Sequence, residues 1–191
     1  MTIKWKSSIS TIAFVLTAGV VLSGHVPLKR ARAQRNNIVA SPSEMLIVAG
    51  DIPADRRDAM LATARKFYLF WNTGDEMLLR QAISESFVDH TLPPGRPQGP
   101  AGPAAAAKAF LAAVPDLKVV VSQQILARDR VVSHLRFTGH FTGQFEHAKG
   151  IGQRVDFIAT DILAIHADRI TDNWHLEDNL TFLKQIGLIP H

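Results

Sequence analysis

The sequence predicts one α+β domain in which helices come first and antiparallel strands follow. Apolar residues recur at helical spacing from Pro53 to Ala113, and they alternate with polar residues from Lys118 to Asp178. Two short reversals, Arg128-Asp129 and His166-Ala167-Asp168, separate the alternating runs, and such short connections join antiparallel strands. With 191 residues and 47% apolar content, the chain can bury one substantial core. Helices and strands segregated along a chain are typical of an α+β arrangement.

The N-terminus has the pattern of a secretory signal. Lys4 and Lys6 precede an uncharged apolar run from Ile9 to Leu22, and Ala31-Arg32-Ala33 has the small-x-small form of a signal peptidase site. We therefore expect residues 1–33 to be a cleavable signal and the mature protein to be periplasmic or secreted. The alternative is an uncleaved membrane anchor, because the uncharged span from Ser7 to Leu28 would nearly cross a bilayer.

The charge of the chain depends on this signal. Five of the 21 basic residues and none of the 17 acidic residues lie within residues 1–33, so 16 basic residues face 17 acidic ones in the mature chain. The basic isoelectric point belongs to the targeting segment and does not indicate nucleic-acid binding. Once the signal is removed, we expect no stable membrane association.

Several kinds of chemistry have no sequence support. The chain contains no cysteine, which excludes disulfides, thiolate nucleophiles and cysteine metal sites. It also lacks a His-Glu-x-x-His motif, a Gly-x-Ser-x-Gly elbow and a glycine-rich phosphate loop before a helix. We therefore expect neither a metal ion nor a cofactor.

The helical part begins after a segment without periodicity, residues 34–52, which we interpret as a linker preceding a domain over residues 53–191. A helix from Pro53 should end at Asn72-Thr73-Gly74, and Asp75 should cap a shorter helix that reaches Ile83. A brief extended segment, Phe87–Thr91, comes next. The Pro- and Gly-rich loop 93–103 then leads to an alanine-rich helix over residues 104–113.

The strand region should contain two hairpins. Lys118–Ala127 and Arg130–Thr138 form the first, and the second follows a Gly-containing loop, residues 143–152. In the second hairpin, steps of two place Asp161 and Asp178 among apolar residues on the covered face, shared with Val155, Phe157, Ala159, Leu163, Ile165, Ile170, Asp172, Trp174 and Leu176. An ionised carboxylate there is costly unless it has a partner or a task. A short helix over residues 179–186 ends the domain.

Individual side chains leave alternatives open. Asp178 is either a proton-transfer group or the N-cap of the last helix. Asp161 either contacts substrate or forms a salt bridge with a basic neighbour. Trp71 and Trp174 belong either to the core or to the lining of a pocket.

Further polar candidates come from one strand and one strand end. His134, Arg136, Thr138 and His140 share one strand face, which is either solvated, a dimer face or the polar wall of a pocket. His90 either orients a substrate carbonyl or lies on the surface.

An ordered set of short segments resembles SnoaL-like polyketide cyclases, also called ester cyclases. The segments are Phe87-Val88-Asp89-His90, Gly99-Pro100, Val114-Pro115-Asp116-Leu117, Arg136–Phe145, Trp174-His175-Leu176-Glu177-Asp178-Asn179 and Leu183–Gly187. The resemblance covers roughly residues 55–188. It implies the conical α+β fold of the nuclear transport factor 2-like superfamily: a curved antiparallel sheet, about three N-terminal helices, a ligand in the cone and a homodimer formed through the sheet.

The resemblance also implies a chemistry. It implies an intramolecular aldol condensation without metal or cofactor, in which an aspartate four residues after the motif tryptophan transfers the proton. That aspartate is Asp178, and Arg136 and His140 are the further catalytic candidates. His90, Trp71, Trp174, His134 and Asp161 would contact a small apolar, carbonyl-bearing ligand. Two alternatives stay open on the same fold, a non-catalytic ligand-binding module and an epoxide or lactone hydrolase.

Overall fold

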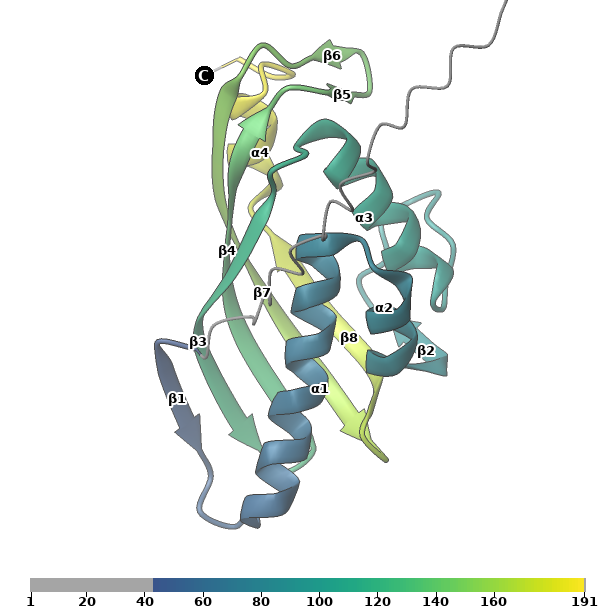
Figure 1. The fold of residues 1–191 in the computed structure, drawn as a ribbon, viewed down its shortest axis with the longest axis vertical. Helices are drawn as coiled ribbons and strands as arrows, with labels where there is room; N and C mark the ends of the chain where they lie inside the picture. Colours follow the sequence, from purple (N-terminus) through teal and green to yellow (C-terminus); the bar gives the residue numbers. More distant parts are fainter. Residues whose placement is uncertain (1–42, 191) are drawn as a thin grey trace, which may run out of the picture. The chain divides into compact units, whose positions relative to one another are not determined.

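The computed structural model describes residues 43–190, which form a curved sheet with helices against it (Figure 1). The helices of this part are α1 (Ala54–Thr73), α2 (Glu76–Ala82), α3 (Ala101–Ala113) and α4 (Asn179–Gln185). The six sheet strands, in spatial order, are β1 (Met45–Val48), β3 (Lys118–Ala127), β4 (Arg130–Phe141), β7 (Gln153–His166), β8 (Arg169–Glu177) and β2 (Ile83–Asp89). A separate small hairpin consists of β5 (Gln144–Phe145) and β6 (Ala148–Lys149). The α+β prediction is confirmed.

The four central strands pair antiparallel, β3 with β4, β4 with β7 and β7 with β8, and the β5–β6 hairpin lies between β4 and β7 in sequence. The two outer strands come from the N-terminal half and pair parallel, β1 with β3 and β2 with β8. β1 lies inside the segment that we interpreted as a linker. The predicted signal, residues 1–33, lies outside the described residues, so export stays a prediction. Within residues 43–190, no helix is both long and apolar enough to cross a membrane.

Helix α1 packs along the sheet because its apolar residues recur on one side. Met60, Ala64 and Phe67 follow at intervals of four and three residues, and all three are buried. The helix ends at Gly74, which adopts φ +68° and donates its amide to the Phe70 carbonyl at 2.7 Å. The predicted stop at this glycine is therefore confirmed.

The two shorter helices also follow local rules. Asp75 caps α2 as predicted, since its Oδ1 accepts the Met77 amide at 2.8 Å. Helix α3 begins three residues before the predicted start at Ala104, because Pro103 occupies the first turn, where its missing N–H costs nothing. The extended segment predicted at Phe87 is longer than expected and begins at Ile83.

The second hairpin departs from the expected alternation at one residue. Ile165 pairs with Ile170 and Ala164 pairs with Asp172, so Thr171 is an additional residue in β8. Because successive strand residues point to opposite faces, this bulge reverses the face of every later side chain. The predicted covered face is correct throughout β7, but beyond Ile170 it is wrong for β8.

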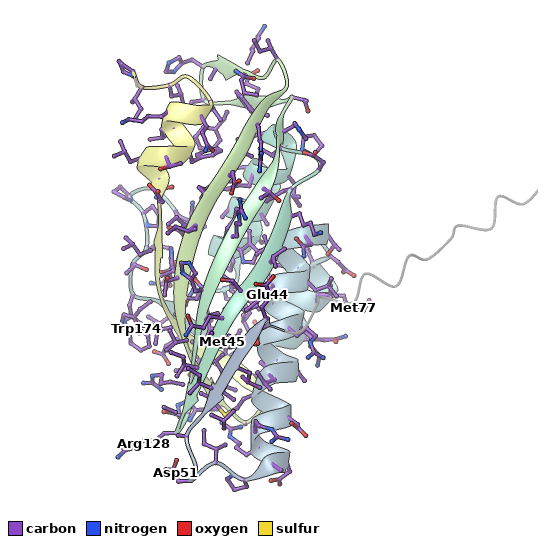
Figure 2. The ribbon with its side chains drawn as sticks, turned by 90° about the vertical axis from the view of Figure 1, so that its left-hand side faces the viewer. Glu44, Met45, Asp51, Met77, Arg128 and Trp174 are labelled. Carbon is purple, nitrogen blue, oxygen red and sulfur yellow. The ribbon has the colours of Figure 1, made fainter. Side chains whose placement is uncertain are left out.

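The reversal changes which β8 side chains face the helices. Asn173 is buried, and it lies on the helix side with His175 and Glu177. Trp174 and Leu176 lie on the opposite, outer face of the sheet, which is the face that Figure 2 presents to the viewer.

Candidate active site

A pocket lies between the helices and the inner face of the sheet. Its cavity volume is about 80 Å³, several times the space that one water molecule requires. Most of its wall is aromatic or aliphatic and includes Phe67, Trp71, Phe87, Phe110, Leu135, Phe137, Phe157 and Ala159. Its polar side chains are Asp89, Arg96, Asp161, Asn173, His175, Glu177 and Asn179. Ionisable groups gathered in an apolar pocket are the usual mark of a binding or catalytic site.

His175 is held between two carboxylates. Its Nε2 lies 3.0 Å from both carboxylate oxygens of Asp89, and its Nδ1 lies 2.7 Å from Oε1 of Glu177. The side chains of His175 and Asp89 are only 8% and 7% exposed. Burial disfavours the charged imidazole, but the hydrogen bonds and charges of Glu177 and Asp89 outweigh it and raise the pKa of His175 to about 9. At neutral pH the ring is therefore an imidazolium that donates from both nitrogens.

Distant parts of the sequence build this cluster. Parallel pairing of β2 with β8 brings Asp89 opposite Asn173, two residues from His175. Thr91 joins the two strands further, because its amide donates to Asp89 Oδ1 at 2.9 Å and its Oγ1 accepts the His175 amide at 2.9 Å. Asp89 and His175 are thus held in place by backbone hydrogen bonds to Thr91 as well as by the side-chain contact between them.

Asp161 is the second ionisable feature of the pocket. It is 6% exposed and lies directly across the β7–β8 pair from His175. Burial raises the pKa of Asp161 to about 7; the positive His175 opposes this shift and the Glu177 carboxylate adds to it. Near neutral pH this carboxyl group can therefore both accept and release a proton.

Two polar atoms next to this carboxylate lack protein partners. Within residues 43–190, neither the Tyr68 hydroxyl nor Oδ1 of Asn173 has a partner in good hydrogen-bond geometry, although both atoms are buried and the hydroxyl lies near Ser133 and Asp161. Burial and the Asp161 charge raise the pKa of Tyr68 well above its ordinary value, so this hydroxyl keeps its proton. Buried groups of this kind require a partner, and a ligand or a water molecule can supply one.

Asp178 occupies a different environment from the one expected. It follows β8 and caps α4, and its Oδ1 accepts the Thr181 amide at 3.0 Å. Hydrogen bonding from Thr181 lowers the pKa of Asp178, which fits the N-cap alternative and does not favour a proton-transfer group. Two features explain this: the bulge at Thr171 turns Asn173, His175 and Glu177 toward the pocket, and β8 ends at Glu177, so Asp178 becomes the N-cap of α4.

The polar face of β4 lies on the outer side of the sheet, away from the pocket. Arg136 binds Asp156 through two hydrogen bonds of 2.6 Å, and this contact lowers the pKa of Asp156. Nδ1 of His140 lies 2.7 Å from Oδ2 of Asp116, on the surface. His134 contacts the Thr160 hydroxyl at 3.2 Å. The structure therefore does not bring these predicted residues together with Asp161.

His90 and Trp174 form a stack that is separate from the pocket lining. Their rings are almost parallel, with centroids 4.3 Å apart. Nε2 of His90 lies 2.8 Å from Oδ1 of Asp172, and the Arg130 guanidinium lies 5.3 Å from the Trp174 ring centroid. Among the predicted site residues, only Trp71 and Asp161 line the pocket.

Sequence reasoning missed Asp89, Asn173, His175 and Glu177 as site residues. A usable signal was present, because all but Asn173 lie in the segments that carry the family resemblance. In β8, uninterrupted alternation places Trp174, Leu176 and Asp178 on the covered face instead of Asn173, His175 and Glu177. Within the described part of the chain, no group of three His, Cys, Asp or Glu side chains is arranged to hold a metal ion.

A curved sheet that encloses an apolar pocket with an acid–base cluster defines the class of protein. The chain has the nuclear transport factor 2-like fold, as its structural neighbours do. The model of the SnoaL-like polyketide cyclase family matches residues 62–186. The chain belongs to this family.

Solved structures agree with this assignment. A candidate polyketide cyclase from Bacillus cereus is 37% identical, with a TM-score of 0.71, and the match covers 78% of this chain and 94% of that one. TsrD from Streptomyces laurentii is 22% identical, with a TM-score of 0.64, over 70% of this chain and 98% of that one. AclR, a candidate hydroxylase from Streptomyces galilaeus, is 21% identical, with a TM-score of 0.63, over 70% and 84% respectively. The last two show the shared fold. A comparison with curated proteins found no match.

Proposed function

We propose that the chain is a cyclase- or isomerase-type enzyme that transfers a proton on a small, apolar, carbonyl-bearing substrate without a cofactor. The proposal rests on one observation. Asp161, whose pKa is about 7, lies across the strand pair from the His175 imidazolium inside an aromatic pocket. A general base is most effective when its pKa lies near the working pH. Family membership supports the same reaction class.

In the proposed reaction, the Asp161 carboxylate removes a proton from the carbon next to the substrate carbonyl. The electrons of that C–H bond move toward the carbonyl oxygen and form an enolate. The N–H groups of His175 already bind Asp89 and Glu177, so the His175 cation would act on this negative charge through its positive charge and not through a hydrogen bond. The enolate carbon then attacks a second carbonyl of the same molecule, and protonated Asp161 returns its proton to the new alkoxide.

One observation favours a second candidate, hydrolysis of an epoxide or lactone. Asn173 lines the pocket, and its Oδ1, which has no hydrogen-bond partner within residues 43–190, can orient a water molecule that Asp161 would deprotonate. The two reactions are separable, because hydrolysis transfers ¹⁸O from labelled water into the product and aldol closure does not.

A bell-shaped pH profile is the expected result of an exchange experiment with 2-tetralone, a small bicyclic ketone. In D₂O, the full chain should exchange the hydrogens next to the carbonyl faster than buffer does. The rate should rise through about pH 7 as Asp161 ionises and fall through about pH 9 as His175 loses its proton. Proton NMR measures the exchange.

Asp178→Asn is the matched control for this experiment, because Asn caps a helix as well as Asp does. It should leave both the rate and the thermal stability almost unchanged. Exchange no faster than buffer would contradict the proposal and favour a non-catalytic ligand-binding module. Loss of exchange in Asp178→Asn would return the acid–base role to that residue.

We further propose that the outer face of the sheet pairs with a second copy of the chain. Ile158, Ile162 and Leu176 are 47%, 39% and 77% exposed on this face. Light scattering at micromolar concentrations should give the mass of a dimer, and Leu176→Glu should give that of a monomer. Ile151→Glu, at an exposed position outside the sheet strands, should remain dimeric. A monomeric wild type would contradict the proposal.

A further inference from the structure

Arg96 is the pocket cation that the proposed reaction does not use. It lies in the loop Pro93–Pro100 between β2 and α3, is half-buried and lines the pocket. Its backbone amide donates to the Pro93 carbonyl at 3.2 Å. Within residues 43–190, its guanidinium forms neither a hydrogen bond nor an ion pair, so its five donors are available to a ligand.

The loop holds Arg96 in a defined place relative to the acid–base cluster. Gln98 binds the Asp89 backbone on both sides: its Oε1 accepts the Asp89 amide at 2.7 Å, and its Nε2 donates to the Asp89 carbonyl at 2.9 Å. At the start of α3, a Cβ added to Gly102 would lie 2.6 Å from the Pro97 carbonyl oxygen, so the helix packs closely on the loop. Asp89 therefore binds both His175 and the loop that carries Arg96.

The two cations of the pocket differ in what they offer a ligand. Both nitrogens of His175 already face protein carboxylates. The Arg96 guanidinium is planar, always charged and suited to two parallel hydrogen bonds with a carboxylate. Its position on the lining of a mostly apolar pocket removes part of its hydration, which a bound anion would replace. A neutral carbonyl would offer only one acceptor atom.

We propose that Arg96 determines specificity and that the pocket accepts an aromatic or alicyclic compound that carries a carboxylate. The carboxylate binds Arg96, and the apolar body contacts the aromatic wall. The other end of the compound lies toward Asp161 and His175, a placement that rests on the function proposed above. In this arrangement, Arg96 orients the substrate and takes no part in proton transfer.

The test compares two planar probes of equal shape, 2-naphthoate and neutral 2-naphthamide, by calorimetric titration of the full chain at neutral pH. Wild type should bind the carboxylate roughly 10- to 100-fold more tightly than the amide, as expected for a charge-assisted contact. Arg96→Gln should remove this preference and leave amide binding unchanged. Arg96→Lys should keep part of it, because Lys retains the charge and loses the planar fork.

Two controls make the result specific. Arg65→Gln, on the exposed side of α1, removes the same charge away from the pocket and should keep the wild-type preference. Asp161→Asn should also keep it while losing proton exchange, so failure of the proposed function is distinguishable from failure of this inference. Equal affinity of wild type for the two probes, no binding of the carboxylate, or an unchanged preference in Arg96→Gln would overturn the proposal.

Discussion

Asp161→Asn is expected to slow 2-tetralone exchange by about 10²- to 10⁴-fold, the usual contribution of a general acid–base group. Asn preserves the shape of the side chain but cannot carry the proton. Because the substitution leaves the aromatic wall intact, binding of 2-naphthamide should stay within about twofold of wild type, a factor worth less than about 0.5 kcal/mol. Exchange by NMR and binding by calorimetry measure the two effects separately.

The same variant should also change stability in a pH-dependent way. The raised pKa of Asp161 means that its contribution to stability is complete below the unfolded value of 3.8 and is lost as the pH rises through about 7. Asp161→Asn should therefore unfold at higher urea concentration than wild type near pH 8, with no such gain near pH 4. Full exchange activity in this variant would exclude Asp161 as the acid–base group.

His175 is expected to make the folded protein less stable as the pH rises from about 7 to 9. Its folded pKa of about 9 lies above the unfolded value of 6.5, so its contribution is complete below pH 6.5 and is lost through pH 9. With about 1.4 kcal/mol per pKa unit, the free energy of unfolding should fall by roughly 2–3 kcal/mol over this range. Urea unfolding of the full chain at several pH values measures the slope.

Two histidine variants test the origin of that slope. His175→Gln should flatten it and lower stability near pH 7, because Asp89 and Glu177 lose the cation between them. His140→Gln, at a surface contact with Asp116, should keep the wild-type slope. An unchanged slope in His175→Gln would show that another group controls this part of the pH dependence.

Much of the fold could be predicted because its signals are local. The bounds of β3 match the prediction at both ends, and Asp75, Gly74 and Asp178 occupy the capping positions that their residue types favour. The covered face of β7 follows from alternation alone, and with it the burial of Asp161. Each of these features depends on residues that are close together in the sequence.

The acid–base cluster required the tertiary structure. A period-two pattern gives no sign of the added residue at Thr171, yet that single residue decides whether His175 or Trp174 faces the pocket. The parallel pairing that brings Asp89 to His175 joins positions 86 residues apart, and no local pattern specifies such a contact. The sequence by itself determined the four helices, the four long strands from Lys118 onward and the buried carboxylate of Asp161, but not the short strands β1, β5 and β6. The sheet register and the pairing of its edge strand decided which side chains surround that carboxylate, because both depend on interactions between distant segments.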